Sequence, residues 1–155
     1  MNTFRRNILK SASGASAVAV AVAAGLLKPT QVMAAWNKSA FEAKTMDEAM
    51  KGIGATAPVD SKSISIKAPD IAENGAVVPV EVTSNLPGTT NISIFAEKNG
   101  TPLVGSYTFS NGALGFVSTR IKMGTTSLVR AVVQAGGKTY TAAKEVKVTI
   151  GGCGG

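Results

Sequence analysis

Apolar and polar residues alternate in seven short runs between residues 64 and 150, and this pattern constrains the fold more than any other sequence feature. A period of two places successive side chains on opposite faces of a β-strand. Val78, Val80 and Val82, for example, alternate with a proline, a glutamate and a threonine. Gly- and Asn-containing turns separate the runs, so the sequence predicts a mainly β fold, an immunoglobulin-like antiparallel β-sandwich of about seven strands. The runs cover residues 64–66, 78–82, 92–96, 107–109, 117–123, 129–133 and 146–150.

Two positions predict finer features of the sandwich. Gly136-Gly137 separates the last two runs, and two consecutive glycines favour a tight hairpin. Pro79 lies inside the second run and cannot donate a backbone hydrogen bond, so it indicates an edge strand or a bulge. Asp70 and Glu73 flank a turn and are interpreted as polar loop residues.

Residues 35–57, which precede the sandwich, have helical character. Ser39 with Glu42, and Thr45 with Glu48, each have the spacing of a capping box. Apolar residues recur at helical spacing after the second box, and such an amphipathic helix is expected to pack on the sandwich and not to bind a ligand. These apolar residues are Met46, Ala49, Met50 and Ile53.

Residues 1–34 have the pattern of an export signal. The pair Arg5-Arg6 is followed by Asn-Ile-Leu-Lys and about 16 mildly apolar residues, fewer than the roughly 20 that a membrane-spanning helix needs. Small residues around position 34 suit a signal peptidase. The segment resembles a twin-arginine signal, which predicts export in the folded state to the bacterial periplasm, without a membrane anchor. The remaining parts are the helical segment, a β-sandwich over residues 58–150 and a C-terminal arm over residues 151–155.

The net charge of +7 does not indicate nucleic-acid binding. Four of the 16 basic residues lie in the expected signal, and the rest of the chain has 12 basic and 9 acidic residues, a net charge of +3. These lysines are interleaved with acidic residues along the strands, which is typical of a solvated surface and not of a stripe that binds phosphates.

The residue types on which most enzymes depend are absent or dispersed. The chain has no histidine, which removes the usual general base and the commonest zinc ligand. It also has no glycine-rich phosphate loop and no close pair of carboxylates. The sequence therefore predicts no catalytic residue, no metal site and no cofactor, and hence a protein that is not an enzyme.

The only cysteine, Cys153, lies between Gly151-Gly152 and Gly154-Gly155 at the C-terminus. One cysteine cannot form an intrachain disulfide, so in an oxidising compartment the thiol is reactive, modified or paired with another chain. Glycine adopts nearly any backbone conformation, so these residues form a thin arm that carries the sulfur about 10 Å past the last strand. No basic neighbour lowers the pKa of the thiol, which stays at or above that of an ordinary cysteine. The sequence thus predicts a carrier whose thiol is activated by the enzyme that receives the arm.

Three segments make the chain resemble the SoxY family, the sulfur-carrying subunits of the bacterial thiosulfate-oxidising (Sox) system. They are Ala-Pro-Asp-Ile-Ala-Glu-Asn-Gly at residues 68–75, Ser-Thr-Arg-Ile-Lys-Met at residues 118–123, and residues 144–155, which end in Gly-Gly-Cys-Gly-Gly. The resemblance covers essentially the whole chain. It implies that Cys153 binds sulfur intermediates covalently and that the protein needs no cofactor.

The same resemblance implies a set of partners. A SoxZ-like β-sandwich subunit would form a heterodimer with the chain. A c-type cytochrome enzyme would join thiosulfate to the thiol, a hydrolase would release sulfate from the adduct, and, where present, a sulfur dehydrogenase would oxidise the remaining sulfur.

Two other functions remain open on the residues alone. The chain could be a periplasmic interaction module whose cysteine forms an intermolecular disulfide with a structural partner. Alternatively, the terminal Gly154-Gly155 could form a thiocarboxylate, as in ubiquitin-like sulfur donors, but the export signal argues against this cytosolic chemistry. Lipidation of Cys153 is disfavoured, since the cysteine lies third from the end and is followed by glycines.

Overall fold

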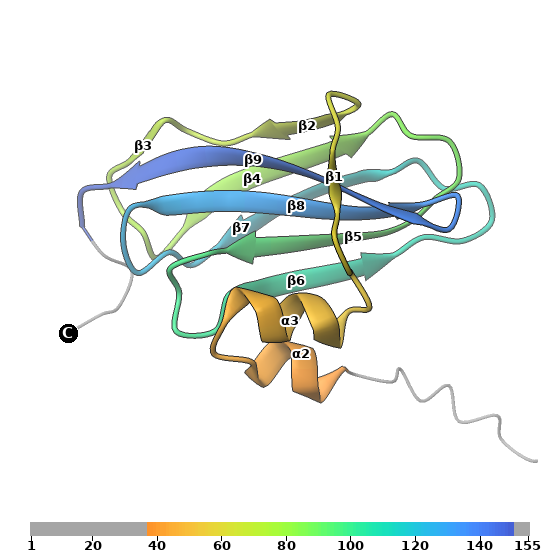
Figure 1. The fold of residues 1–155 in the computed structure, drawn as a ribbon. Coiled ribbons are helices and arrows are strands. Elements are labelled where there is room, and N and C mark those ends of the chain that lie inside the picture. The colour runs from red at the N-terminus through yellow and green to blue at the C-terminus, as the bar shows by residue number, and fades with distance from the viewer. Residues whose placement is uncertain (1–36, 151–155) are drawn as a thin grey trace, which may run out of the picture. The chain divides into compact units, whose positions relative to one another are not determined.

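Two β-sheets packed face to face dominate the computed structural model, which describes residues 37–150 (Figure 1). Nine strands are found in this part of the chain. They are β1 (Val59–Asp60), β2 (Ile64–Lys67), β3 (Ile71–Ala72), β4 (Val78–Ser84), β5 (Thr89–Ala96), β6 (Leu103–Thr108), β7 (Phe116–Ile121), β8 (Ser127–Ala135) and β9 (Lys138–Val148).

The larger sheet has the order β1-β9-β8-β5-β6, with β3 also paired to β9, and the smaller sheet has the order β2-β4-β7. The chain crosses between the sheets near its start: β1 and β3 both run parallel to β9, while β2 between them joins the smaller sheet. The predicted β-sandwich is therefore confirmed. Each of the seven predicted runs corresponds to one of the longer strands, and β1 and β3 were not predicted.

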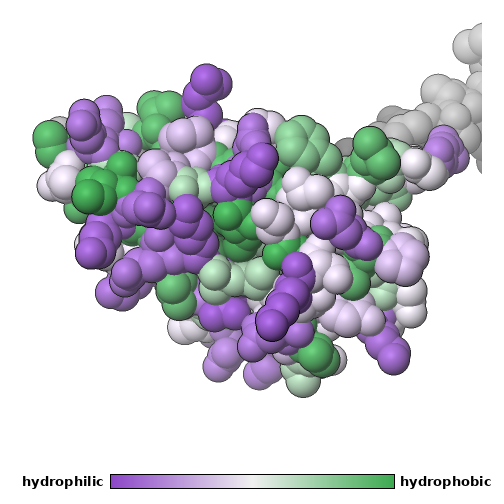
Figure 2. Space-filling model, turned by 90° about the horizontal axis from the view of Figure 1, so that it is seen from above, coloured by the Kyte–Doolittle hydropathy of each residue, from purple (hydrophilic) through white to green (hydrophobic). Residues whose placement is uncertain are grey.

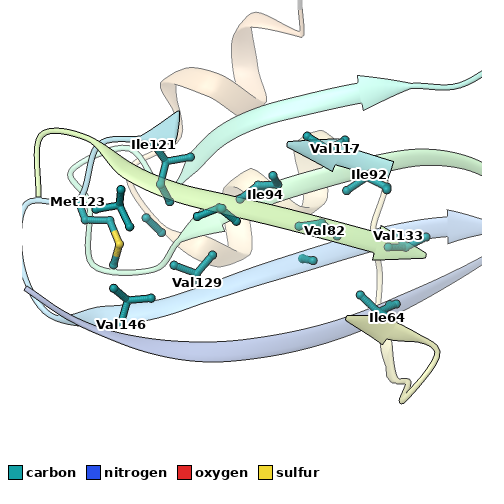
Figure 3. Packing of buried hydrophobic residues seen from close by; sticks show 14 of the residues in the cluster. Ile64, Val82, Ile92, Ile94, Val117, Ile121, Met123, Val129, Val133 and Val146 are labelled. Atoms are coloured by element: carbon teal, nitrogen blue, oxygen red, sulfur yellow. The ribbon is translucent and has the colours of Figure 1, made fainter. Parts of the chain in front are cut away.

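Alternating side chains from the two sheets form the core between them. Val78, Val80 and Val82 of β4 are fully buried, as are Ile92 and Ile94 of β5. Figure 3 shows side chains from both sheets converging in this space. The period of two in the sequence thus reports which face of each strand is turned to the core.

The predicted tight hairpin joins β8 to β9. Gly136 and Gly137 have φ angles of +54° and +75°, the left-handed conformation that both central residues of a type I′ turn need. Ala135 pairs with Lys138 directly across the turn.

The prediction that Pro79 marks an edge strand or a bulge is wrong, because β4 is the central strand of the smaller sheet. Pro79 lies opposite Arg120 of β7 in regular register. On the other side, β2 pairs with β4 only from Glu81 onward. The proline is tolerated because it occupies the part of β4 that β2 does not reach.

Two short helices cover the outer face of the larger sheet. They are α2 (Lys38–Glu42) and α3 (Met46–Gly52), and they pack on Phe95, Leu103 and Val132. The predicted apolar face is confirmed: Ala49 is fully buried, and Met46, Met50 and Ile53 pack against the same cluster.

The two predicted capping boxes have different outcomes. Thr45 caps α3, and its hydroxyl accepts a hydrogen bond from the Glu48 N–H at 3.3 Å. The first box is wrong, because Asn37 is the N-cap of α2 and Ser39 lies inside that helix. Asparagine is as good a cap as serine and comes earlier in the chain.

Within residues 37–150, neither helix is long and apolar enough to span a membrane.

Candidate functional site

The site expected from the sequence begins where the described structure ends. The last described residue is Ile150, which follows strand β9 and is 68% exposed. The residues singled out from the sequence, namely Arg5, Arg6, Gly151, Gly152, Cys153, Gly154 and Gly155, lie outside the described residues. The structure therefore describes the base from which the expected arm starts.

Strand β3 holds one side of the end of β9. The N–H of Lys147 donates to the carbonyl of Asp70 at 3.0 Å, and the N–H of Thr149 donates to the carbonyl of Ala72 at 3.1 Å. The hydroxyl of Thr149 donates to the carbonyl of Glu73 at 3.0 Å. These hydrogen bonds continue the pairing of β9 past the last residue of the strand.

A threonine side chain holds the other side. β8 begins at Ser127, which pairs with Val146, so the residues after Val146 extend beyond β8. There the N–H of Val148 donates to the Oγ1 of Thr126 at 2.9 Å. The side chain thus replaces the main-chain acceptor that a longer β8 would supply.

Ile150 itself is connected to the core through two hydrogen bonds in series. Its carbonyl accepts from the N–H of Gly75 at 2.9 Å, and the carbonyl of Gly75 accepts from the N–H of Met123 at 2.7 Å. Met123 is fully buried beside Val129 and Val146 (Figure 3). The chain is consequently fixed up to its last described residue.

A charged pair adds to this arrangement. The Nζ of Lys144 lies 3.0 Å from the Oδ1 of Asp70 and donates to the carbonyl of Ala68 at 2.6 Å. The Asp70 side chain is 89% exposed, so the ion pair contributes little to stability. The main-chain hydrogen bonds therefore do most of the anchoring.

The surface around this base includes exposed apolar side chains. Ile71 in β3 and Val77 before β4 are 59% and 55% exposed, and both lie near the segment that binds Ile150. Figure 2 shows hydrophobic residues among hydrophilic ones on the side of the molecule that carries β2 and β3.

Sequence reasoning missed the anchoring role of residues 70–75. Asp70 and Glu73 were interpreted as polar loop residues, yet their carbonyl groups hold Lys147 and Thr149. Every residue except proline carries the same main-chain donor and acceptor, so residue identity could not reveal these contacts.

A metal centre is not formed within residues 37–150, where no three acidic, histidine or cysteine side chains gather.

The fold and the site define a β-sandwich protein whose last strand is fixed up to the point where a short C-terminal segment begins. The chain belongs to the SoxY family: the family model described as sulfur oxidation protein SoxY matches residues 49–153, more than half of the chain. The matched region ends at Cys153.

Solved structures agree with this assignment. The sulfur carrier protein SoxY from Chlorobium limicola f thiosulfatophilum is 48% identical, with a TM-score of 0.62, over 68% of this chain and 97% of that chain. A superoxide reductase (neelaredoxin) from Ignicoccus hospitalis is 21% identical, with a TM-score of 0.50, over 56% of this chain and 80% of that chain. The second likeness concerns the fold alone. No curated protein sequence matches the chain.

Proposed function

We propose that the chain carries sulfur intermediates of thiosulfate oxidation on the thiol of Cys153 and presents them in turn to partner enzymes. The observation that carries this proposal is the position of the single cysteine. It is the middle residue of Gly-Gly-Cys-Gly-Gly, which follows directly after a strand end that is hydrogen-bonded on both sides. A fixed base with a thin, adaptable tip lets the sulfur enter a narrow channel while the domain stays outside.

Two further observations support the proposal. The family match extends to Cys153, so the cysteine belongs to the part of the chain that follows the family pattern. The solved structure at 48% identity is described as a sulfur carrier protein.

The proposed chemistry balances with an external oxidant. A thiol and thiosulfate combine to a thiosulfonate disulfide, R–S–S–SO₃⁻, with release of one proton and two electrons. A c-type cytochrome enzyme of the Sox system accepts the electrons. Water then attacks the terminal sulfonate sulfur in a hydrolase, which releases sulfate and two protons and leaves R–S–S⁻ on the carrier.

The chain itself supplies no catalytic group in this scheme. Gly151, Gly152, Gly154 and Gly155 form the arm, Cys153 is the attachment point, and the enzymes that receive the arm activate the thiol. A sulfur dehydrogenase, where the host has one, would oxidise the sulfur that remains. The proposed compartment is the periplasm, which the chain would reach through the signal that contains Arg5 and Arg6.

The test is the intact mass of the protein purified from thiosulfate-grown host cells, before and after mild reduction. We expect a set of reducible adducts on Cys153 that correspond to added sulfur atoms, or to sulfur plus a sulfonate group. In the same host, replacement of the cysteine in Cys153→Ser is expected to abolish thiosulfate oxidation.

Two outcomes would contradict the carrier function. The first is full thiosulfate oxidation by the Cys153→Ser strain. The second is a thiol that is always bridged to one protein in constant stoichiometry on non-reducing electrophoresis, which would indicate the interaction module.

A further inference from the structure

A groove lined by basic side chains lies at the end of the sandwich where β9 ends. Its volume is about 830 Å³, and it is formed by the turn between β5 and β6 together with the end of β7 and the turn that follows. Three exposed basic residues line it, Lys98, Arg120 and Lys122, here called the basic triad. The half-buried Val104 contributes apolar surface to its lining, while Leu103 and Ile121, which also line it, are buried.

The positive charge of the triad is not neutralised within the described part of the chain. None of the three forms an ion pair with a described acidic residue. Glu97, which precedes Lys98, is engaged elsewhere, because Arg130 donates to its Oε1 at 2.6 Å. Among residues 37–150, no acidic side chain lines the groove.

A fourth cation, Lys44, also lines the groove but is excluded from the triad. The same lysine borders a neighbouring hollow together with Glu42 and Glu48, so acidic residues already lie in its surroundings.

The walls of the groove are held in place by one asparagine. Asn99 in the β5–β6 turn donates through Nδ2 to the carbonyl of Lys122 at 2.7 Å and accepts at Oδ1 from the N–H of Gly124 at 3.0 Å. The N–H of Lys98 donates to the Oγ of Ser127 at 3.0 Å. Lys98 and Lys122 are therefore presented on two connected turns, beside Arg120 at the end of β7, which lowers the ordering cost of binding.

Hydrogen bonds connect the groove to the base of the arm. Met123, whose N–H binds the carbonyl of Gly75, lies between Lys122 and Gly124, and Gly75 binds Ile150. In Figure 1 the β5–β6 turn, the β7–β8 turn and the end of β9 lie at the same end of the sandwich. An enzyme that receives the arm must approach this end.

We propose that the groove binds an acidic polypeptide segment on the enzymes that receive the arm, and so orients the carrier before the arm enters. Charge complementarity identifies the ligand as anionic. A small oxyanion would occupy only a small part of 830 Å³, since one water takes about 30 Å³ in the liquid. The apolar surface of Val104 and the spread of three exposed cations over two segments of the chain suit an extended chain of carboxylates. This inference rests on the proposed carrier function.

The first experiment measures peptide binding and does not depend on the thiol. The full exported chain with Cys153→Ser is titrated against a fluorescein-labelled octaglutamate peptide, with octaglutamine as the uncharged comparison. We expect saturable binding of octaglutamate that weakens as salt rises from about 50 to 200 mM. Reversal of two charges in Lys98→Glu/Lys122→Glu is expected to weaken binding about tenfold.

Matched controls separate the groove from the overall charge. Lys62→Glu/Lys138→Glu changes the net charge equally on exposed lysines at the opposite end of the sandwich and is expected to leave the affinity within about twofold. Lys98→Gln/Lys122→Gln, a milder change that leaves the fold intact, is expected to give an intermediate loss. Equal loss in the two reversal variants would overturn the proposal. A competition experiment could overturn the proposal as well. If sulfate or thiosulfate displaced the peptide more strongly than chloride at equal ionic strength, the groove would be assigned to small oxyanions.

The second experiment uses the carrier as a substrate of the thiosulfate-conjugating cytochrome enzyme from the same host. With Cys153 present, Lys98→Glu/Lys122→Glu is expected to raise KM for the carrier severalfold with kcat unchanged. Unchanged KM together with unchanged peptide binding would refute the groove and leave the carrier function standing. Turnover of the Cys153→Ser chain would refute the carrier function and leave the peptide result intact.

Discussion

Glycines have one structural role in the described part of this chain and a different, proposed role in the C-terminal arm. Gly136 and Gly137 are needed for one fixed conformation, since both have positive φ in the β8–β9 hairpin. Gly151 and Gly152 lie beside the proposed attachment point, where thinness and freedom matter more than any one conformation. Substitutions should therefore affect stability at the first pair and activity at the second.

At the hairpin, Gly137→Ala is expected to lower the free energy of unfolding by about 1 kcal/mol, because an L-residue at φ +75° is strained. Space is not the cause, since a Cβ at this position would meet no atom within 4 Å. Gly100→Ala is the control: it has equal space and no positive φ, so its stability should change by less than about 0.5 kcal/mol. Urea unfolding measures both, and equal losses would contradict the assignment of strain.

In the arm, Gly152→Phe is expected to lower kcat/KM for the carrier with the conjugating enzyme by roughly 10- to 100-fold, because the ring cannot enter a channel shaped for glycine. The rate of alkylation of Cys153 by free iodoacetamide should stay unchanged, since the thiol remains accessible to a small reagent. A normal kcat/KM would contradict the proposed insertion of the arm.

At the scale of elements, the decisive feature is the way β9 ends. β8 is too short to pair with the last residues of β9, and β3 together with the Thr126 side chain completes the hydrogen bonding there. A strand that would otherwise fray is thus held up to Ile150.

Removal of the threonine hydroxyl tests this arrangement. Thr126→Val leaves the Val148 N–H without its acceptor and should cost about 1–2 kcal/mol of unfolding free energy. Faster hydrogen exchange at the Val148 amide is expected in the same variant. Thr125→Val is the matched control, because the side chain of Thr125 is exposed and makes no hydrogen bond within residues 37–150. Unchanged exchange at Val148 would show that β3 alone holds the strand end.

Elements also differ in how far the sequence predicts them. The longer strands each bury one face, so alternation in the sequence reports them directly. β1 and β3 have two residues each, which is too short for any periodic pattern, and they exist because β9 offers them an edge. Pro79 was misplaced because the sequence does not tell how far a neighbouring strand extends.

The proposed attachment site and the basic triad also differ in how far the sequence predicts them. The thiol and its glycines are contiguous, so the sequence alone could single them out around Cys153. The basic triad comes from two segments that lie more than 20 residues apart, the β5–β6 turn and the end of β7 with the turn that follows it. Hydrogen bonds from Asn99 to Lys122 and from Lys98 to Ser127 hold these segments together. In the sequence these lysines are spaced like ordinary surface residues.

At the scale of the whole described unit, the proposals assign different functions to the two ends of the sandwich. Ile150, from which the proposed arm starts, and the basic groove lie at one end, and the β8–β9 hairpin lies at the other. The helices α2 and α3 cover one outer face of the larger sheet. If a partner subunit binds, sheet edges and the outer face of the smaller sheet are available to it away from Ile150.

A SoxZ-like subunit from the same host is expected to form a 1:1 complex with the chain without a disulfide. Light scattering after size exclusion should give the same heterodimer mass for the native chain and for Cys153→Ser, with or without reductant. Loss of the complex in the serine variant would indicate that the cysteine makes a structural crosslink, as in the interaction-module hypothesis.

The anchoring of β9 also has a mechanical consequence. A load that acted on the end of the chain along the axis of β9 would be perpendicular to the hydrogen bonds that join β9 to β8. Such a load acts in shear and is shared by many of the β8–β9 hydrogen bonds at once. A load directed across the strand would instead break these hydrogen bonds one after another. Under such a load the end of β9 would resist unravelling, so the proposed arm could be drawn into an enzyme while the domain stays folded.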